Sequence, residues 1–146
     1  MSVSTRARPT PAAEAWELLS GLFIAHKRRF LAMSSEHGLS PPQSGALLRL
    51  DAEDPVPMSE LAEALMCDAS NVTGIVDRLE ARGLVERRPA PKDRRVKMLA
   101  LTAAGAAVRE QLSKRMSEPP EQLAALPAAD QRALRDLLKR ALGPKA

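Results

Sequence analysis

The stretch MSELAEALMCDASNVTGIVDRLEARGLVERRPAPKDRRVKMLALTAAG, residues 58–105, decides the fold of this chain of 146 residues. Its first half predicts a short helix and a longer helix joined by a tight turn, with Ser59 and Asp68 as the expected N-caps. Apolar residues of the second helix recur at the three- and four-residue steps of one helix face: Val72, Ile75, Val76 and Leu79. Gly83 can adopt the left-handed conformation that ends this helix. The two helices therefore predict a helix-turn-helix.

After Gly83 the periodicity changes from that of a helix to that of a strand. Residues 84–89 and 96–101 are two short strand-like runs. In the second run one set of side chains alternates with another: Lys97, Leu99 and Leu101 against Val96, Met98 and Ala100. The polar, basic segment 90–95 between the runs is typical of a hairpin loop. A β-hairpin with a cationic tip is therefore expected directly after the helix pair.

The outward face of the second helix carries small and polar side chains, which suit a close approach to DNA bases and phosphates. From this helix we expect DNA contacts by Ser70, Asn71, Thr73 and Arg78. The helix pair alone fits an ordinary helical hairpin with a solvated face equally well. The basic hairpin favours a winged helix-turn-helix, because a hairpin in this position is a wing that can reach the adjacent minor groove.

The tip of the wing is expected to contact DNA through its arginines. Arginine suits the narrow, negatively charged minor groove, so we expect Arg95 to enter it, with Arg94 beside it. Asp93 can hold the Arg95 guanidinium in a bidentate ion pair, and the alternative is an exposed turn whose charges balance. The basic and polar residues favour DNA over a protein groove. A winged helix that serves protein contacts without sequence-specific DNA binding is the alternative function.

The segment before the helix-turn-helix predicts two helices with clear starts. Thr10 and Pro11 predict the start of a long helix that Gly38 closes. Ser40 and Gln43 have the spacing of a capping box, in which each side chain bonds to the backbone of the other residue. The long helix has one apolar face, made by Trp16, Leu19, Phe23, His26, Phe30 and Met33.

The segment after the hairpin predicts further helices. Thr102 is the expected cap of the first, and Pro119 with Pro120 should kink or split it. The last helix has an apolar stripe formed by Leu134, Leu137, Leu138, Ala141 and Leu142. The expected fold class is thus mainly α with a small β-hairpin wing.

Composition narrows the class of protein. Hydrophobic residues make up 45% and charged residues 27% of the chain, as in a globular protein rather than a disordered one. The net charge of +4 suits a polyanionic partner but decides little alone. The chain lacks a membrane-length apolar segment and a signal peptide, so we expect a cytoplasmic protein that does not enter the membrane.

Several function classes lack their sequence signals. The chain has no glycine-rich phosphate loop, no Ser/His/Asp constellation and no tyrosine, so an enzyme is not expected. Its two histidines lie far from any cysteine pair, which predicts no structural metal, and we expect no cofactor. Cys67 is interpreted as a buried structural thiol rather than a redox sensor. His26 is interpreted as a packed or dimer-interface residue rather than a ligand contact.

The chain resembles the MarR family of winged helix-turn-helix transcriptional regulators from about residue 16 to residue 142. The resemblance is carried by LSPPQ at 39–43, SELAEAL at 59–65 and VDRLEARGLVERR at 76–88. Its most specific part is PKDRRVKMLALTAAG at 91–105, with an Asp-x-Arg wing tip and a Leu-Thr-x-x-Gly junction. The chain departs from the family pattern at Met66, where a glycine is common, and at Pro127, which replaces the usual cap of the last helix.

The resemblance implies a homodimer that carries two winged-helix lobes onto a pseudo-palindromic double-stranded operator. Residues 1–146 would form one domain, with dimerisation helices at about 10–38 and 102–146 and a DNA-binding lobe at about 39–101. The DNA contacts implied by matching positions are Ser70, Asn71, Thr73 and Arg78, with Arg95 in the minor groove steadied by Asp93. The resemblance also implies a repressor relieved by a small, often phenolic, effector.

Overall fold

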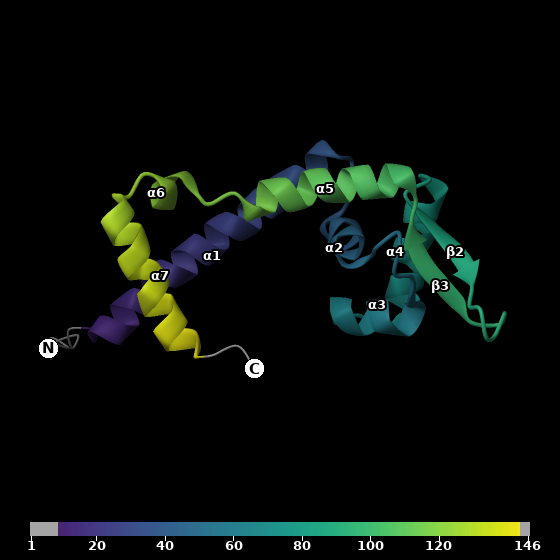
Figure 1. Cartoon of the computed structure of the whole chain (residues 1–146), viewed down its shortest axis with the longest axis horizontal. Coiled ribbons are helices and arrows are strands. Elements are labelled where there is room, and N and C mark those ends of the chain that lie inside the picture. Colours follow the sequence, from purple (N-terminus) through teal and green to yellow (C-terminus); the bar gives the residue numbers. More distant parts are fainter. Residues whose placement is uncertain (1–8, 144–146) are drawn as a thin grey trace, which may run out of the picture. The chain divides into compact units, whose positions relative to one another are not determined.

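The computed structural model describes residues 9–143 (Figure 1). The helices are α1 (Pro11–Glu36), α2 (Pro41–Arg49), α3 (Met58–Leu65), α4 (Ala69–Ala81), α5 (Ala103–Ser117), α6 (Glu121–Ala124) and α7 (Ala128–Leu142). The strands are β1 (Val56–Pro57), β2 (Val85–Pro89) and β3 (Lys97–Leu101). The chain divides into two compact units, Met1–Ser113 and Lys114–Ala146. The predicted class, mainly α with a small β-hairpin wing, is confirmed, and the helix-turn-helix and the wing lie in the first unit.

Local capping explains where the first two helices begin. The Thr10 hydroxyl accepts the backbone N–H of Ala13 at 3.3 Å, and Pro11 is the first residue of α1. At α2, Ser40 accepts the N–H of Gln43 at 3.4 Å, and the Gln43 side chain accepts the N–H of Ser40 at 2.8 Å. The predicted capping box is therefore present, and it satisfies two of the donors that a helix N-terminus leaves unpaired.

The next two helix starts differ from the prediction. α3 begins at Met58, so Ser59 lies inside the helix, and Pro57 occupies the N-cap without a side-chain hydrogen bond. Asp68 does occupy the N-cap of α4, but its carboxylate accepts the side-chain amide of Asn71 at 2.9 Å rather than a backbone N–H. Both helices lack a side-chain cap, so packing rather than capping holds their starts in place.

The wing belongs to a three-stranded antiparallel sheet with the order β1-β3-β2. β1 was not predicted, because two residues are too short to show an alternating pattern; it pairs Val56 with Leu99. The predicted alternation in the second strand is wrong, since Leu99, Ala100 and Leu101 are all buried. β3 is the middle strand of the sheet and also contacts α3, and its last three residues are covered on both faces, whereas Lys97 at the wing end stays exposed.

The core of the first unit lies between α2, α3, α4, β3 and the part of α5 up to Leu112. Its fully buried large side chains include Leu47, Leu61, Val76, Leu79, Leu99 and Leu112. Each such side chain contributes about 1.5–3 kcal/mol through burial of apolar surface. α1 adds little to this core: only Met33 and Ser34 are buried, whereas the side chains of Trp16 and Phe23 are 71% and 70% exposed.

Asp51 ties the end of α2 to β3 and α5. Its backbone carbonyl accepts the N–H of Leu101 at 3.1 Å, and its carboxylate accepts Arg109 at 3.1 Å. The N–H of Glu53 also donates to this carboxylate at 3.0 Å, and this bond, together with the charge of Arg109, lowers the pKa of Asp51. The acidic turn after α2 therefore has a fixed conformation.

The junction between the end of α4 and the start of α5 has the closest backbone approach. Gly83 has φ +68°, which lets Leu84 turn back so that its N–H donates to the carbonyl of Leu79 at 3.0 Å. The Leu84 carbonyl then accepts the N–H of Thr102 at 3.2 Å. A Cβ atom added to Gly105 would lie 1.9 Å from the same carbonyl oxygen. Glycine at 105 is thus required by packing.

The second unit is a small helical unit interrupted by prolines. α5 ends at Ser117, and Pro120 and Pro127 precede α6 and α7 without side-chain caps, so the predicted interruption is confirmed. The Gln131 amide donates to the carbonyls of Ala124 and Leu126 at 3.1 and 2.8 Å, which joins the two helices. Leucines of α6 and α7 line an apolar hollow of about 410 Å³.

Residues 9–143 contain neither a metal-binding cluster nor a membrane-spanning helix. Three or more His, Cys, Asp or Glu side chains nowhere gather there as a metal-binding group. None of the helices in this part of the chain has the length and apolarity needed to cross a membrane.

We expect Gly105→Ala to lower the free energy of unfolding by about 2–3 kcal/mol, because the new methyl group would overlap the Leu84 carbonyl. Gly74→Ala is the matched control: its added Cβ meets nothing within 4 Å, and alanine should stabilise α4 by up to about 1 kcal/mol. Urea unfolding followed by circular dichroism measures both. Equal stability of Gly105→Ala and the unsubstituted protein would contradict the close approach.

Candidate nucleic-acid interface

α3 and α4 meet at the turn Met66–Cys67–Asp68. Met66 has φ 51° and ψ 41°, a left-handed conformation that glycine adopts more easily, and its side chain is 94% exposed. The N–H groups of Met66 and Cys67 donate to the carbonyls of Glu63 and Ala62 at 3.0 and 3.1 Å. These bonds close α3 and set the direction in which α4 leaves the turn.

α4 has one buried face and one exposed face. Its buried residues, Val72, Ile75, Val76 and Leu79, are the four that the sequence predicts. All four candidate contact residues of this helix lie on the exposed face: Ser70, Asn71, Thr73 and Arg78. The helix-turn-helix therefore presents a polar surface to solvent, as a recognition helix requires.

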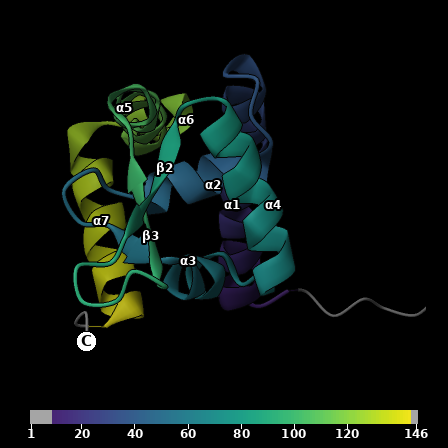
Figure 2. The ribbon, with the colours of Figure 1, turned by 90° about the vertical axis from the view of Figure 1, so that its right-hand side faces the viewer.

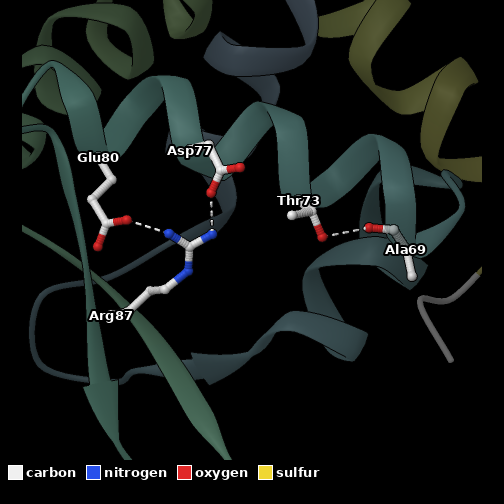
Figure 3. A network of polar contacts seen from close by, with 5 residues as sticks. All are labelled: Ala69, Thr73, Asp77, Glu80 and Arg87. Carbon is white, nitrogen blue, oxygen red and sulfur yellow. Dashed lines mark hydrogen bonds and ion pairs between the residues drawn. The ribbon is translucent and has the colours of Figure 1, made fainter.

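Three of these four residues line one hollow of about 360 Å³. Ser70, Asn71 and Arg78 form its α4 wall, and Ser40 and Pro42 at the start of α2 form part of the opposite wall. Thr73 lies outside this hollow, and its hydroxyl donates to the carbonyl of Ala69 at 2.9 Å on its own helix (Figure 3). The structure thus brings Ser70, Asn71 and Arg78 together and leaves Thr73 on a separate part of the helix surface.

Cys67 is placed differently from the prediction of a buried thiol. Its side chain is half-buried at the edge of this hollow, and its thiol donates to the carbonyl of Leu65 at 3.3 Å. Left-handed Met66 turns the chain here, so Cys67 comes to the surface instead of the interior. His26 is also half-buried on α1.

The wing is built on the β2–β3 pair, which lies beside α4 (Figure 2). The loop closes through two backbone bonds, Ala90 N–H to Val96 at 2.9 Å and Val96 N–H to Asp93 at 3.0 Å. The Asp93 carboxylate accepts the backbone N–H of Arg95 at 3.0 Å. Asp93 therefore shapes the turn that carries Arg95.

The bidentate ion pair expected between Asp93 and the Arg95 guanidinium is wrong. The Asp93 carboxylate instead accepts the backbone N–H two residues later, which closes a local turn, and within residues 9–143 the Arg95 guanidinium forms no ion pair with it. Arg94 and Arg95 are exposed, and their guanidinium groups have no partner within residues 9–143. Both are free to meet an external anion.

An arginine nearer the base of the wing forms ion pairs within the protein instead. Arg87 on β2 donates to the carboxylates of Asp77, at 2.6 Å, and Glu80 on α4 (Figure 3). Its hydrogen bond to Asp77, with the charge of Glu80, raises the pKa of Arg87 above the ordinary arginine value. The sequence pattern alone indicated no role for Arg87. The three-residue spacing of Asp77 and Glu80 puts two carboxylates on one helix face, but the strand pairing that brings Arg87 to them is a long-range feature.

A second arginine that bonds within the protein lies at the end of α4. Arg82, the C-cap of α4, donates to the carbonyls of Gly38 and His37 at 2.6 and 2.9 Å. These carbonyls end α1, whose last turn has no basic residue of its own. Arg82 thus supplies the positive charge that a helix C-terminus favours, and it ties α4 to α1. Nothing in the sequence pattern indicates this contact, which spans 44 residues.

Known proteins share this arrangement. A family model described as MarR family matches residues 39–97, which include α2, the helix-turn-helix and most of the wing. The transcriptional repressors NicR of Pseudomonas putida and MdtR of Bacillus subtilis are 35% and 36% identical to the chain over 62% and 60% of its length. The aligned parts cover only 58% and 56% of these two relatives.

A solved structure extends the likeness beyond the matched segment. The crystal structure of apo MarR from Escherichia coli superposes with a TM-score of 0.68 at 27% sequence identity, over 94% of this chain and 100% of that one. The family match, the sequence likeness to the relatives and the structural superposition all point to the same family. The chain belongs to the MarR family of winged-helix proteins.

Proposed function

We propose that this chain is a homodimeric, sequence-specific regulator of transcription that binds double-stranded DNA, rather than an enzyme. The observation that carries the proposal is the pairing of the exposed polar face of α4 with an adjacent wing whose Arg94 and Arg95 guanidiniums have no partner within residues 9–143. A protein groove would favour apolar residues on these surfaces. Cations without internal partners favour phosphate and minor-groove contacts.

In this proposal α4 enters the major groove. Ser70, Asn71 and Arg78 stand on one wall of the hollow and can donate or accept hydrogen bonds at base edges and phosphates. Thr73 contacts DNA through its methyl group or through a hydroxyl that keeps its bond to Ala69. Arg95 enters the flanking minor groove, Arg94 binds the backbone, and Asp93 holds the turn in shape.

Exposed apolar side chains support the dimer. On α1 the exposed large apolar residues are Trp16, Leu18, Leu19, Phe23, Ile24 and Leu31. On α7 no residue is buried, and Leu137 and Leu142 are exposed. Helices with this much exposed apolar surface normally pack against a partner, and a second copy of the chain is the occupant that a two-fold DNA site requires.

The direction of regulation is proposed by analogy. NicR and MdtR are named as repressors, and we infer the same for this chain. A small effector, with phenolic compounds as the class the family implies, would bind between the dimer helices and the DNA-binding lobes and weaken DNA binding. The protein would act in the cytoplasm.

We expect selection from a random DNA pool by the purified protein to enrich an inverted repeat, with half-site centres about 10 base pairs apart, bound by a dimer. Two-fold symmetry of the protein requires this symmetry of the site. Sequencing of the bound fragments shows whether the site is an inverted repeat, and sedimentation of the complex shows whether a dimer binds it. Failure to enrich any sequence would favour the protein-interaction alternative, and an asymmetric single half-site bound by a monomer would overturn the dimer.

We expect Arg95→Ala to weaken binding to the selected operator at least about tenfold, or about 1.4 kcal/mol, because the wing loses its minor-groove cation. Fluorescence anisotropy with a labelled duplex measures the affinity. Arg132→Ala removes the same charge from an exposed position on α7 and is the control, expected to change affinity less than twofold. Equal effects of the two variants would remove the wing from the interface.

Operator affinity should fall by about a thousandfold between 50 and 200 mM salt, since a dimer that neutralises six or more phosphates releases a matching number of counterions. Titrations at four salt concentrations give the slope of log K against log salt concentration. A flat response would contradict binding led by phosphate contacts.

A further inference from the structure

Arg87 differs from the other arginines of the wing because its guanidinium bonds to carboxylates of another element, the helix α4. Its side chain is 23% exposed, against 46% for its neighbour Arg88. Arg88 bonds to Glu86, two residues away on the same strand, so this pair links nothing beyond β2. Arg87 bonds to Asp77 and Glu80, ten and seven residues away on α4, and therefore joins two elements.

The two acceptors of Arg87 put negative charge on α4, where it is unfavourable for binding DNA. Asp77 and Glu80 lie on α4, next to Arg78 of the candidate interface, and their side chains are 58% and 41% exposed. Carboxylates so close to DNA phosphates repel them. An arginine fork that bonds both carboxylates compensates one of their two negative charges and holds both groups in one geometry. An isolated surface ion pair, by contrast, has little energetic effect.

The position of Arg87 on β2 connects this network to the wing tip. Arg87 pairs with Leu99, which is fully buried, and the following pairs, Arg88 with Met98 and Pro89 with Lys97, lead directly into the loop. A strand tied to α4 at Arg87 cannot slide along the helix without breaking two charged hydrogen bonds. The distance between the helix surface and the wing tip is thereby set at the base of the hairpin.

We propose that Arg87 is a positioning residue for DNA recognition: through Asp77 and Glu80 it fixes the wing against α4, so that both reach one DNA site in register. This inference rests on the proposed function. Arg87 itself does not bind DNA in this account, because its donors are used within the fold. Substitution of Arg87 should weaken binding to the operator more than binding to unrelated DNA. Only the operator requires the helix and the wing to bind specific positions together.

The test compares Arg87→Gln with the matched control Arg88→Gln, which removes the same charge from the adjacent residue of β2. Affinities are measured for the selected operator and for a shuffled duplex of equal length, at one salt concentration, after thermal unfolding has shown that the variants fold. We expect both variants to weaken shuffled-duplex binding alike, by less than threefold. Arg87→Gln should weaken operator binding at least tenfold, and Arg88→Gln less than threefold.

A second arm removes the acceptors. Asp77→Asn with Glu80→Gln deletes two negative charges, which on charge alone strengthens binding to any DNA. The positioning account expects the opposite for the operator, at least fivefold weaker binding, while the shuffled duplex binds equally or more tightly. Adding Arg87→Gln to this double variant should cause no further loss of operator affinity beyond the less than threefold loss that its charge causes for any duplex.

The outcomes separate the two proposals. Tighter operator binding by the double variant, or equal behaviour of Arg87→Gln and Arg88→Gln, would overturn the positioning role and leave the proposed function intact. Absence of operator binding by the unsubstituted protein would overturn the proposed function itself. If Arg87→Gln does not fold, Arg87→Lys keeps the charge without the fork, and the positioning account then expects a selective loss of operator affinity of at least threefold.

Discussion

The contact between the Leu84 carbonyl and the first turn of α5 is the constraint on which the rest of the structure depends. Leu84 follows Gly83 at the end of α4 and directly precedes β2, and its carbonyl accepts the N–H of Thr102 where β3 ends. The Thr102 hydroxyl also donates to the carbonyl of Gly83 at 2.6 Å and accepts the N–H of Gly105 at 3.1 Å. The recognition helix, the wing and α5 therefore share one joint, and only glycine at 105 leaves room for it.

From this joint the two surfaces of the candidate interface extend with limited freedom. α4 is held by its buried apolar face and, at its end, by Arg82 on the carbonyls of α1. β2 is held by its pairing with the middle strand β3 and by the bonds of Arg87 to α4. The arginines of this region thus divide into two kinds. Arg82 and Arg87 are engaged within the fold, whereas Arg94 and Arg95 extend from the wing loop and are available to an external anion.

How much of this could be predicted depends on the range of the interaction that decides each feature. Capping and periodicity act over three or four residues, so the Ser40–Gln43 box, the buried face of α4 and the end of that helix at Gly83 follow from the sequence. β1 could not be predicted, because its two residues form a strand only by pairing with β3. The same applies to Arg82 and Arg87, whose partners are brought near by the fold. The error at Ser59 arose because α3 begins one residue before it, and the error at Asp93 arose because that carboxylate had two local bonding options.

The most direct test of the central claim, that α4 and the wing bind the two grooves of one DNA site together, is methylation interference on the selected operator. Methylation at guanine N7 marks the major groove, and methylation at adenine N3 marks the minor groove. The account predicts interference at major-groove positions in the centre of each half-site and at minor-groove positions on both outer flanks, under the two wings. Interference confined to the major groove, or absent from both grooves, would contradict it.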